Sequence, residues 1–250
     1  MNKKIILQLD QLNQNFYKTT ADSFDQTRQF AWQGWVKLLP AIKSLASKKI
    51  SVLDVGCGNG RFGEFLIENQ INFTYTGVDN NQQLLDKAEA KLKQTNIKYN
   101  LQNLNLVKLL IDDQLAGQFQ QKFDLIVSFG VLHHIPSFKL RVNLIDQLGL
   151  LLKDDNSLLV LTAWQFGQDA RFNSKKIEPE KTGVNPENLE ENDFILDWQS
   201  NKRIARYCHF VDEQEIEKIE TEISNLELKQ RFFADGKTKD LNKYLIWKKN

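Results

Sequence analysis

The segment Val52–Phe62, VLDVGCGNGRF, constrains the fold more than any other part of the sequence. It reads as a buried strand that runs into a glycine-rich turn. The turn opens a helix, so backbone N–H groups face whatever lies above the strand end. Three glycines remove the β-carbons that would block the close approach of a ligand: Gly56, Gly58 and Gly60. The segment therefore predicts a ligand site at the end of the first strand.

The spacing of these glycines separates two kinds of ligand. A dinucleotide-binding turn follows the pattern G-x-G-x-x-G, which would put a glycine where this chain has Arg61. The chain instead has an acid, Asp54, two residues before the first glycine. A pyrophosphate gains nothing from a carboxylate there, whereas a cofactor that contains an amino acid does. The turn therefore favours a cofactor with an amino-acid end.

A second acid, Asp79, ends the next predicted strand within the segment Tyr75–Leu85. The distance along the chain from Gly60 leaves room for one helix and one strand. A carboxylate at a strand end can accept hydrogen bonds from both hydroxyls of a ribose. Each motif has a simpler alternative, chain reversal for the turn and helix capping for Asp79. Their combination in this order favours a nucleoside cofactor.

Short apolar strands alternate with helical segments, which predicts an α/β fold with a doubly wound, mostly parallel sheet. The predicted strands are Lys49–Val55, Phe73–Val78, Ile97–Leu101, Phe123–Ser128 and Ser157–Thr162. The predicted helices between them are Arg61–Asn69, Asn81–Gln94 and Phe138–Leu151. Another helical region, about Asp22–Ala46, is expected within an N-terminal segment 1–48. We expect residues 1–250 to form a single domain.

The pattern changes after the fifth strand. Residues 165–210 combine aromatic and charged residues, and a connection of this length is expected to be a lid or a substrate-binding insertion. A helix should begin after Asp212 as N-cap, with Glu215 completing a capping box. Two closing strands, Leu226–Phe233 and Asn242–Lys248, are expected to form a hairpin on the sheet edge. The expected sheet has seven strands, with the last one antiparallel.

The composition narrows the function classes. Lysine and arginine total 33 against 32 acids, a net charge of +1, so no overall basic field marks a nucleic-acid binder. The two cysteines, Cys57 and Cys208, provide neither a disulfide framework nor a Cys-rich zinc site. The apolar run Ile5–Leu7 is too short for a signal peptide, and no stretch approaches the ~18 apolar residues of a membrane span. We expect a cytoplasmic protein.

With these motifs, the chain resembles the class I S-adenosylmethionine-dependent methyltransferases over nearly its full length. The resemblance implies a Rossmann-like fold and S-adenosyl-L-methionine as cofactor. It implies that Asp54 and the glycine turn hold the methionine end, and that Asp79 holds the ribose. The segments Phe123–Pro136 and Leu150–Trp164 resemble the motifs of the fourth and fifth strands. The family also places an acid after the third strand, near the adenine amine, and Asn103 is the candidate here.

A narrower resemblance is to the tRNA wobble-uridine carboxymethyl methyltransferases, which esterify 5-carboxymethyluridine. Three short motifs carry it: a pattern before the first strand, a histidine pair after the fourth, and an aromatic-rich lid. The matching residues are Tyr17, Ala21, Phe24, Thr27 and Arg28; His133 and His134; and Asp193, Trp198, Arg206, Tyr207 and His209. The resemblance implies tRNA as a partner. Eukaryotic relatives also use a small zinc-binding activator protein.

A carboxylate acceptor would determine which residues the reaction needs. It is already ionised near pH 7, so it needs neither a base nor a metal, and no residue spacing suggests a metal site. It does need a guanidinium to hold it, and Arg28 and Arg206 are the candidates. An ordinary surface position is the alternative for each. One histidine of the pair should line the pocket; His133 is our candidate, although the sequence does not separate it from His134.

Three functions stay open at this point. The first is a tRNA-modifying O-methyltransferase, in which Trp198 and Tyr207 would stack on a nucleobase; the alternative is that these residues form the core of the lid. The second is a small-molecule O-methyltransferase acting on a carboxylate, phenol or quinone-like metabolite, which the net charge favours. The third is a catalytically silent scaffold, against which the intact Asp54, glycine turn and Asp79 argue.

Overall fold

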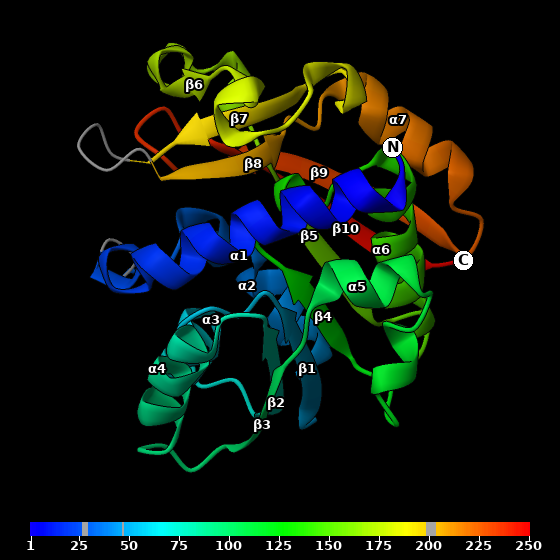
Figure 1. Cartoon of the computed structure of the whole chain (residues 1–250). Helices are drawn as coiled ribbons and strands as arrows, with labels where there is room; N and C mark the ends of the chain where they lie inside the picture. The colour runs from blue at the N-terminus through cyan, green and yellow to red at the C-terminus, as the bar shows by residue number, and fades with distance from the viewer. Residues whose placement is uncertain (27–29, 47, 199–203) are drawn as a thin grey trace.

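The structure is a computed structural model that describes residues 1–26, 30–46, 48–198 and 204–250. Its central element is a seven-stranded sheet in the order β3-β2-β1-β4-β5-β10-β9 (Figure 1). Strands β1 to β5 are parallel, and β10 is antiparallel to both of its neighbours. The strands are β1 (Ile50–Val55), β2 (Phe73–Asp79), β3 (Lys98–Asn103), β4 (Leu125–Ser128), β5 (Leu158–Trp164), β9 (Leu226–Ala234) and β10 (Asn242–Lys249). The predicted fold class and closing hairpin are confirmed.

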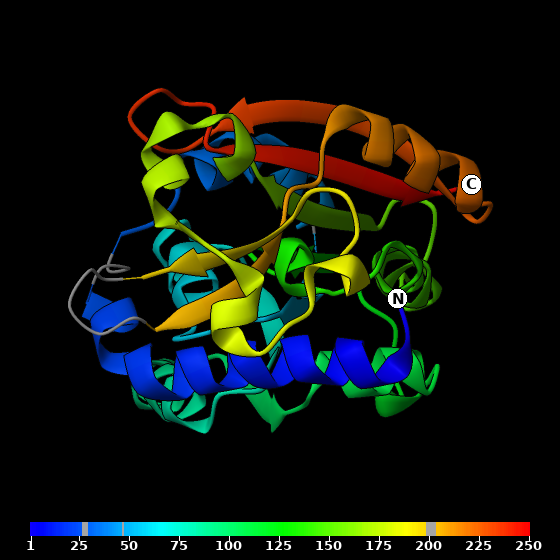
Figure 2. The same cartoon turned by 45° about the horizontal axis from the view of Figure 1, so that its top comes forward.

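Helices cover both faces of this sheet, as Figures 1 and 2 show. One face packs against α2 (Gln33–Leu45), α3 (Arg61–Glu68) and α4 (Gln82–Leu92). The other packs against α5 (Leu106–Ile111), α6 (Phe138–Leu150) and α7 (Glu213–Glu222). Helix α5 was not predicted from the sequence, because its six residues are too few to show a helical period. Among the described residues, no helix has the length and apolar character needed to span a membrane.

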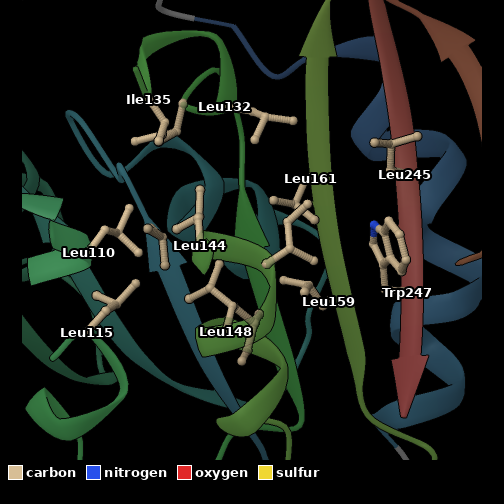
Figure 3. Packing of buried hydrophobic residues seen from close by; sticks show 14 of the residues in the cluster. Leu110, Leu115, Leu132, Ile135, Leu144, Leu148, Leu159, Leu161, Leu245 and Trp247 are labelled. Carbon is tan, nitrogen blue, oxygen red and sulfur yellow. The ribbon is translucent and has the colours of Figure 1, made fainter. Parts of the chain in front are cut away.

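The two halves of the core follow from the alternation of strand side chains between the faces of a sheet. In β5, Leu159 and Leu161 belong to the cluster on the α6 side, and Leu158 belongs to the cluster on the α2 side. Figure 3 shows Leu144 and Leu148 of α6 in the first cluster, together with Leu159 and Leu161 of β5 and with Trp247 of β10. Because β5 is apolar on both faces, it can only be an internal strand.

The N-terminal helix α1 (Lys3–Gln26) crosses the side of the sheet where the parallel strands end (Figure 1). The residues on its inner face recur at helical spacing. They are buried: Ile5, Ile6, Leu9, Asp10, Asn13, Phe16 and Thr20. The predicted start near Asp22 was wrong. Polar Asp10 and Asn13 interrupt the apolar pattern, yet both are buried because they face a cavity rather than solvent.

The part of the chain between β5 and α7, which contains the predicted insertion 165–210, forms a second sheet. Its strands are β6 (Lys176–Ile177), β7 (Asp193–Asp197) and β8 (Ala205–His209), all antiparallel. Ile195 and Tyr207 of this sheet pack against Ile5 and Leu9 of α1. These strands were not predicted from the sequence. Short 3-10 helices complete the chain: Ala116–Gln118, Leu132–His134, Phe166–Gln168, Ala170–Lys175, Pro179–Thr182 and Pro186–Asn188.

Candidate functional site

A cavity of about 830 Å³ lies at the carboxyl ends of the parallel strands, with walls from α1 and the second sheet. This volume is in the range of small-molecule sites. The cavity brings together six of the predicted site residues: Asp54, Gly56, Gly58, Asp79, His133 and Arg206. Gly60 and Asn103 are not among its lining residues. Arg28 falls in a part of the chain that the structure does not describe.

Asp54, near the end of β1, is 3% exposed, and its Oδ2 accepts a hydrogen bond of 2.6 Å from the Tyr75 hydroxyl. Burial raises the pKa of Asp54 to about 7; the Tyr75 bond opposes the rise, Asp79 adds to it, and Arg61 opposes it. A cationic ligand group would favour the ionised form of this carboxyl. The ammonium group of an amino acid is such a ligand.

Arg61 stands at the first position of α3, where a dinucleotide-binding turn has glycine, and it lines the same cavity. Its guanidinium lies 5.7 and 5.4 Å from the ring centres of Trp32 and Trp35, and its Nη1 donates to the Phe30 carbonyl oxygen at 2.8 Å. Burial lowers the pKa of Arg61 to about 10, and the charge of Asp54 opposes that fall. Arg61 is therefore a cation at neutral pH, so this end of the cavity offers both charges that an amino-acid zwitterion needs.

Asp79 is held at the cavity wall by the backbone. Its Oδ2 accepts from the Gly58 amide and its Oδ1 from the Asn81 amide, both at 2.9 Å. Burial raises the pKa of Asp79, and the backbone hydrogen bonds oppose the rise. Each oxygen keeps a further lone pair for a ligand. The position therefore fits the two hydroxyls of a ribose.

The three glycines of the turn all have positive φ, and each meets a different steric need. At Gly58, φ is +54° and a β-carbon would meet nothing within 4 Å, so the missing side chain leaves open space in the cavity wall. At Gly56, a β-carbon would lie 2.2 Å from Val131. At Gly60, it would lie 3.0 Å from Ala88 of α4. Gly60 thus allows α3 to pack on α4 and does not line the cavity.

Asn103 is not turned toward the cavity. It is the exposed last residue of β3, and its Nδ2 donates to Gln82 Oε1 at 3.0 Å. The loop after β3 instead presents Asn105, whose Nδ2 donates to Asp10 Oδ2 at 2.9 Å. Asp10 lines the cavity. The cavity wall near β3 therefore carries the Asp10 carboxylate of α1 and not the predicted Asn103.

Helix α1 contributes residues to the site that were not predicted from the sequence. Asp10, Asn13 and Tyr17 all line the cavity. Their spacing, three and then four residues, places them on one face of a helix. This spacing is the sequence signal that could have identified them as one polar helix face. Nothing in the local sequence indicates which element that face meets, because the contact depends on the tertiary fold.

The histidine pair divides between two positions in the cavity wall. His134 Nδ1 lies 3.0 Å from the Tyr207 carbonyl oxygen, and its Nε2 lies 2.7 Å from the Tyr17 hydroxyl. Because a carbonyl only accepts, Nδ1 carries a proton that it donates to Tyr207. His134 therefore joins α1 to β8 through its two ring nitrogens. His133 is buried, and its ring centre lies 5.0 Å from that of Trp164.

Arg206 is buried, at 6% exposure, inside a box of aromatic rings. Its guanidinium carbon lies 5.0, 5.0 and 5.3 Å from the ring centres of Phe16, Trp164 and Trp198. Its Nε is buried without a hydrogen-bond partner among the described residues, and none of the ion pairs between described residues includes Arg206. Such a buried cation lacks the anion that would compensate its desolvation.

The two predicted stacking residues differ in position. Trp198 lines the cavity. Tyr207 is fully buried in the second sheet, where its hydroxyl donates to Asp193 Oδ1 at 2.6 Å. Tyr207 therefore belongs to the core of the insertion, which was the alternative that the sequence left open.

A buried chain of charges connects the second sheet to α6 and α7. His209 bridges Asp193 Oδ1 at 2.7 Å and Glu215 Oε2 at 2.5 Å, and Arg141 Nε donates to Glu215 Oε1 at 2.6 Å. The Glu215 amide donates to Asp212, so the predicted N-cap is confirmed. The predicted capping-box role of the Glu215 side chain was wrong, because its carboxylate is used by Arg141 and His209.

One group of potential metal ligands occurs beside the cavity. The ligand atoms of His133, His134 and Cys208 all lie within 4.8 Å of one another. Both ring nitrogens of His134 already have hydrogen-bonding partners. Burial raises the pKa of the Cys208 thiol to about 11, so the thiolate that a metal requires is scarce at neutral pH. We assign no metal to this group.

Residues 53–158 match a protein family described as a methyltransferase domain. The ubiquinone biosynthesis O-methyltransferase of Coxiella burnetii is 32% identical over 136 residues, which are 49% of this chain and 53% of that protein. The tRNA (carboxymethyluridine(34)-5-O)-methyltransferase ALKBH8 of Mus musculus is 27% identical over 177 residues, which are 70% of this chain and 23% of that protein. The chain thus spans about half the length of the first relative and less of the second.

The fold is shared with solved structures of methyltransferases. An S-adenosylmethionine-dependent methyltransferase from Clostridium acetobutylicum superposes with a TM-score of 0.64 and 16% identity, covering 94% of this chain and 100% of that one. At this identity the likeness concerns the fold alone. Asp54, Asp79 and the glycine turn lie inside the segment that matches the family. Residues 53–158 therefore match a methyltransferase domain, and the whole fold is that of an S-adenosylmethionine-dependent methyltransferase.

Proposed function

We propose that this chain methylates a carboxylate held by Arg206, and that the acceptor is 5-carboxymethyluridine at the wobble position of tRNA. The observation that carries the proposal is the buried guanidinium of Arg206, which lines the cavity without a described ion-pair partner. A carboxylate fits its planar donor fork. Arg28, the other candidate for this role, lies outside the described residues and stays a prediction.

The cofactor end of the site would use four of the predicted residues. Asp54 would hold the ammonium group and Asp79 the ribose, while Gly56 and Gly58 shape the wall beside them. Gly60 would act only through the packing of α3 on α4. Asn103 has no part in this proposal, because its side chain is bonded to Gln82 away from the cavity.

The chain's own residues would position and enclose the reactants. S-adenosylmethionine, when bound, supplies an electrophilic methyl group. An acceptor carboxylate is ionised at neutral pH, so His133 is not needed as a base and would pack beside the acceptor with Trp164. The aromatic box would exclude water and orient Arg206. After methylation the ester is neutral, so its attraction to Arg206 falls, which favours product release.

The tRNA part of the proposal rests on three observations. The mouse relative with 27% identity acts, by its name, on carboxymethyluridine in tRNA. Trp198 lines the cavity, and a nucleobase can stack on an aromatic ring of this kind. Lys175 and Lys237 also line the cavity and could meet phosphates. The possible zinc-binding activator remains part of this proposal through the family resemblance.

A second candidate is methylation of a small molecule such as a carboxylate, phenol or quinone-like metabolite. The identity of 32% to a ubiquinone biosynthesis O-methyltransferase favours it. The net charge of +1 also favours it, because proteins that bind tRNA usually carry an excess of basic residues that neutralise its phosphates.

Methyl transfer by the purified protein would separate the two candidates. Radiolabelled S-adenosylmethionine would be supplied with tRNA carrying 5-carboxymethyluridine, with the same tRNA carrying unmodified uridine, and with a set of small acids and phenols. We expect label in the first tRNA, as a base-labile ester, and none in the second. Label in a small acid or phenol, with neither tRNA labelled, would replace the proposal by the second candidate.

A further inference from the structure

The parallel strands present their end groups in a fixed spatial order. The sheet order β4-β1-β2-β3 places Asp54 of β1 next to Asp79 of β2, and β3 follows on the far side of β2. If Asp54 faces the ammonium group and Asp79 the ribose, the ligand runs from β1 toward β3. The base attached to the ribose then lies at the β3 end of the cavity. This placement rests on the proposed cofactor site.

Asp10 is the acid at that end of the cavity. Its Oδ2 accepts 2.9 Å from Nδ2 of Asn105, the N-cap of α5 directly after β3. A second bond to the same oxygen, 2.7 Å long, comes from Gln14 Nε2 on the next turn of α1. The adjoining wall is apolar, with Leu106 and Val107 of α5 lining the cavity.

The environment of Asp10 is unusual for a carboxylate. The side chain is buried, at 4% exposure, and its hydrogen-bond donors among the described residues are both uncharged amides. Both donors reach Oδ2, while Oδ1 accepts no hydrogen bond from the described residues. Keeping a carboxylate in a buried position costs free energy unless its oxygens are satisfied. A ligand that donates to Oδ1 would complete the site.

We propose that Asp10 recognises the exocyclic amine of the cofactor's adenine, with Asn105 as the residue that positions its carboxylate. The amine donates a hydrogen bond, and a carboxylate accepts one. Hypoxanthine carries a carbonyl oxygen at the same ring position, which would face the carboxylate oxygen without a proton between them. Leu106 and Val107 form the apolar wall against the base. The specificity for adenine thus comes from α1, outside the segment 53–158.

The test compares the binding of two ligands by titration calorimetry. S-adenosylhomocysteine carries the adenine amine, and S-inosylhomocysteine carries the carbonyl in its place. We expect the wild-type chain to bind the adenine compound about tenfold to hundredfold more tightly, the range for a hydrogen bond to a charged group. Asp10→Asn should reduce this preference to a few-fold, because an amide can turn either its donor or its acceptor toward the ring.

The control is Asn103→Ala, which removes the other candidate near β3 and should leave both affinities unchanged because Asn103 lies off the cavity. Far-ultraviolet circular dichroism and the thermal midpoint check that Asp10→Asn keeps α1 folded. If the wild-type chain binds neither compound, the proposed cofactor site fails. If it binds both equally, or if Asp10→Asn retains the wild-type preference while folded, the assignment of Asp10 is overturned and the cofactor site stands.

Discussion

Tyr75 of β2 donates its hydroxyl to Asp54 of β1 at 2.6 Å, and both side chains are buried between adjacent parallel strands. The bond stabilises the ionised form of Asp54, yet burial still raises its pKa to about 7. Asp54 therefore changes charge in the physiological range. The tyrosine is itself a poor acid, since burial raises its pKa well above the ordinary value, so the proton exchanged near neutral pH belongs to Asp54.

Binding of S-adenosylhomocysteine should become tighter as the pH rises. Only the ionised form of Asp54 attracts the ligand's ammonium group, and with a pKa of about 7 that form is scarce at pH 5.5 and about half populated at pH 7. We expect the affinity to rise about tenfold across this interval. Titration calorimetry at several pH values measures it. Asp54→Asn should weaken binding and remove the pH dependence; an affinity that falls with pH in the wild type would contradict the assignment.

Replacement of Asp79 by alanine should weaken the binding of S-adenosylhomocysteine by about 1–3 kcal/mol. The change removes a carboxylate that two backbone amides hold at the cavity wall, and this is the range for hydrogen bonds to a charged group. Calorimetry again gives the affinity. Asn103→Ala is the matched control, because that side chain ends the neighbouring strand but lies off the cavity. A larger effect at Asn103 than at Asp79 would refute this orientation of the ligand.

The cofactor motif could be predicted from the sequence because its information is local. Asp54 and Asp79 lie at strand ends and the glycines follow β1 directly, and parallel strands bring their carboxyl ends to one edge of the sheet. Asp10 could not be found in this way. It belongs to a helix whose position over the cavity depends on contacts with β8 and α5. The partners of Glu215 were missed for the same reason. The sequence pattern predicted a capping-box role, whereas the carboxylate contacts Arg141 of α6 and His209 of β8.

Stability should depend on His209 and should fall as the pH rises. Burial alone would lower the pKa of His209, but hydrogen bonds to Asp193 and Glu215 outweigh it, and the pKa lies above its ordinary 6.5. A raised folded-state pKa contributes stability that is fully present below about pH 6.5 and is lost as the pH rises through the folded value. Urea unfolding at pH 6 and at pH 8.5 measures this difference.

The variant His209→Gln breaks this buried charge network and should lower the free energy of unfolding by about 3–5 kcal/mol at pH 6. The loss should be smaller at pH 8.5, where the wild-type ring has given up more of its proton. Lys229→Gln, in an exposed pair with Glu227, serves as the control and should change stability by less than about 1 kcal/mol. An equal effect of His209→Gln at both pH values would show that its charge is not involved.

Methyl transfer should not depend on a metal ion. The potential ligand group of His133, His134 and Cys208 has an engaged His134 and a thiol whose burial raises its pKa to about 11. A carboxylate acceptor also needs no metal-bound nucleophile. We expect the rate to be unchanged after dialysis against EDTA. A rate that is lost in EDTA and restored by magnesium would instead indicate a hydroxyl acceptor activated by a metal.

Replacement of Arg206 by lysine should lower kcat/KM for the acceptor about tenfold to hundredfold while the affinity for S-adenosylhomocysteine stays the same. Lysine keeps the positive charge but loses the planar fork that matches a carboxylate, and a hydrogen bond to a charged group is worth about 1.5–3 kcal/mol. The cofactor acids lie at the ends of β1 and β2, whereas Arg206 lies on β8 among Phe16, Trp164 and Trp198. Initial rates with varied acceptor, together with calorimetry, separate the two effects.

The matched control is Arg171→Lys, because Arg171 belongs to the same insertion but is exposed and paired with Asp169. It should leave both the rate and the cofactor affinity unchanged. The amide of the same acid provides a second comparison as a competitive inhibitor, since it keeps the shape but has neither the charge nor the nucleophilic carboxylate oxygen. Arg206→Lys should leave its inhibition constant nearly unchanged while it weakens the use of the charged acceptor. If the variant methylates the acid at the wild-type rate, Arg206 does not hold the carboxylate, and its aromatic box has a structural role instead.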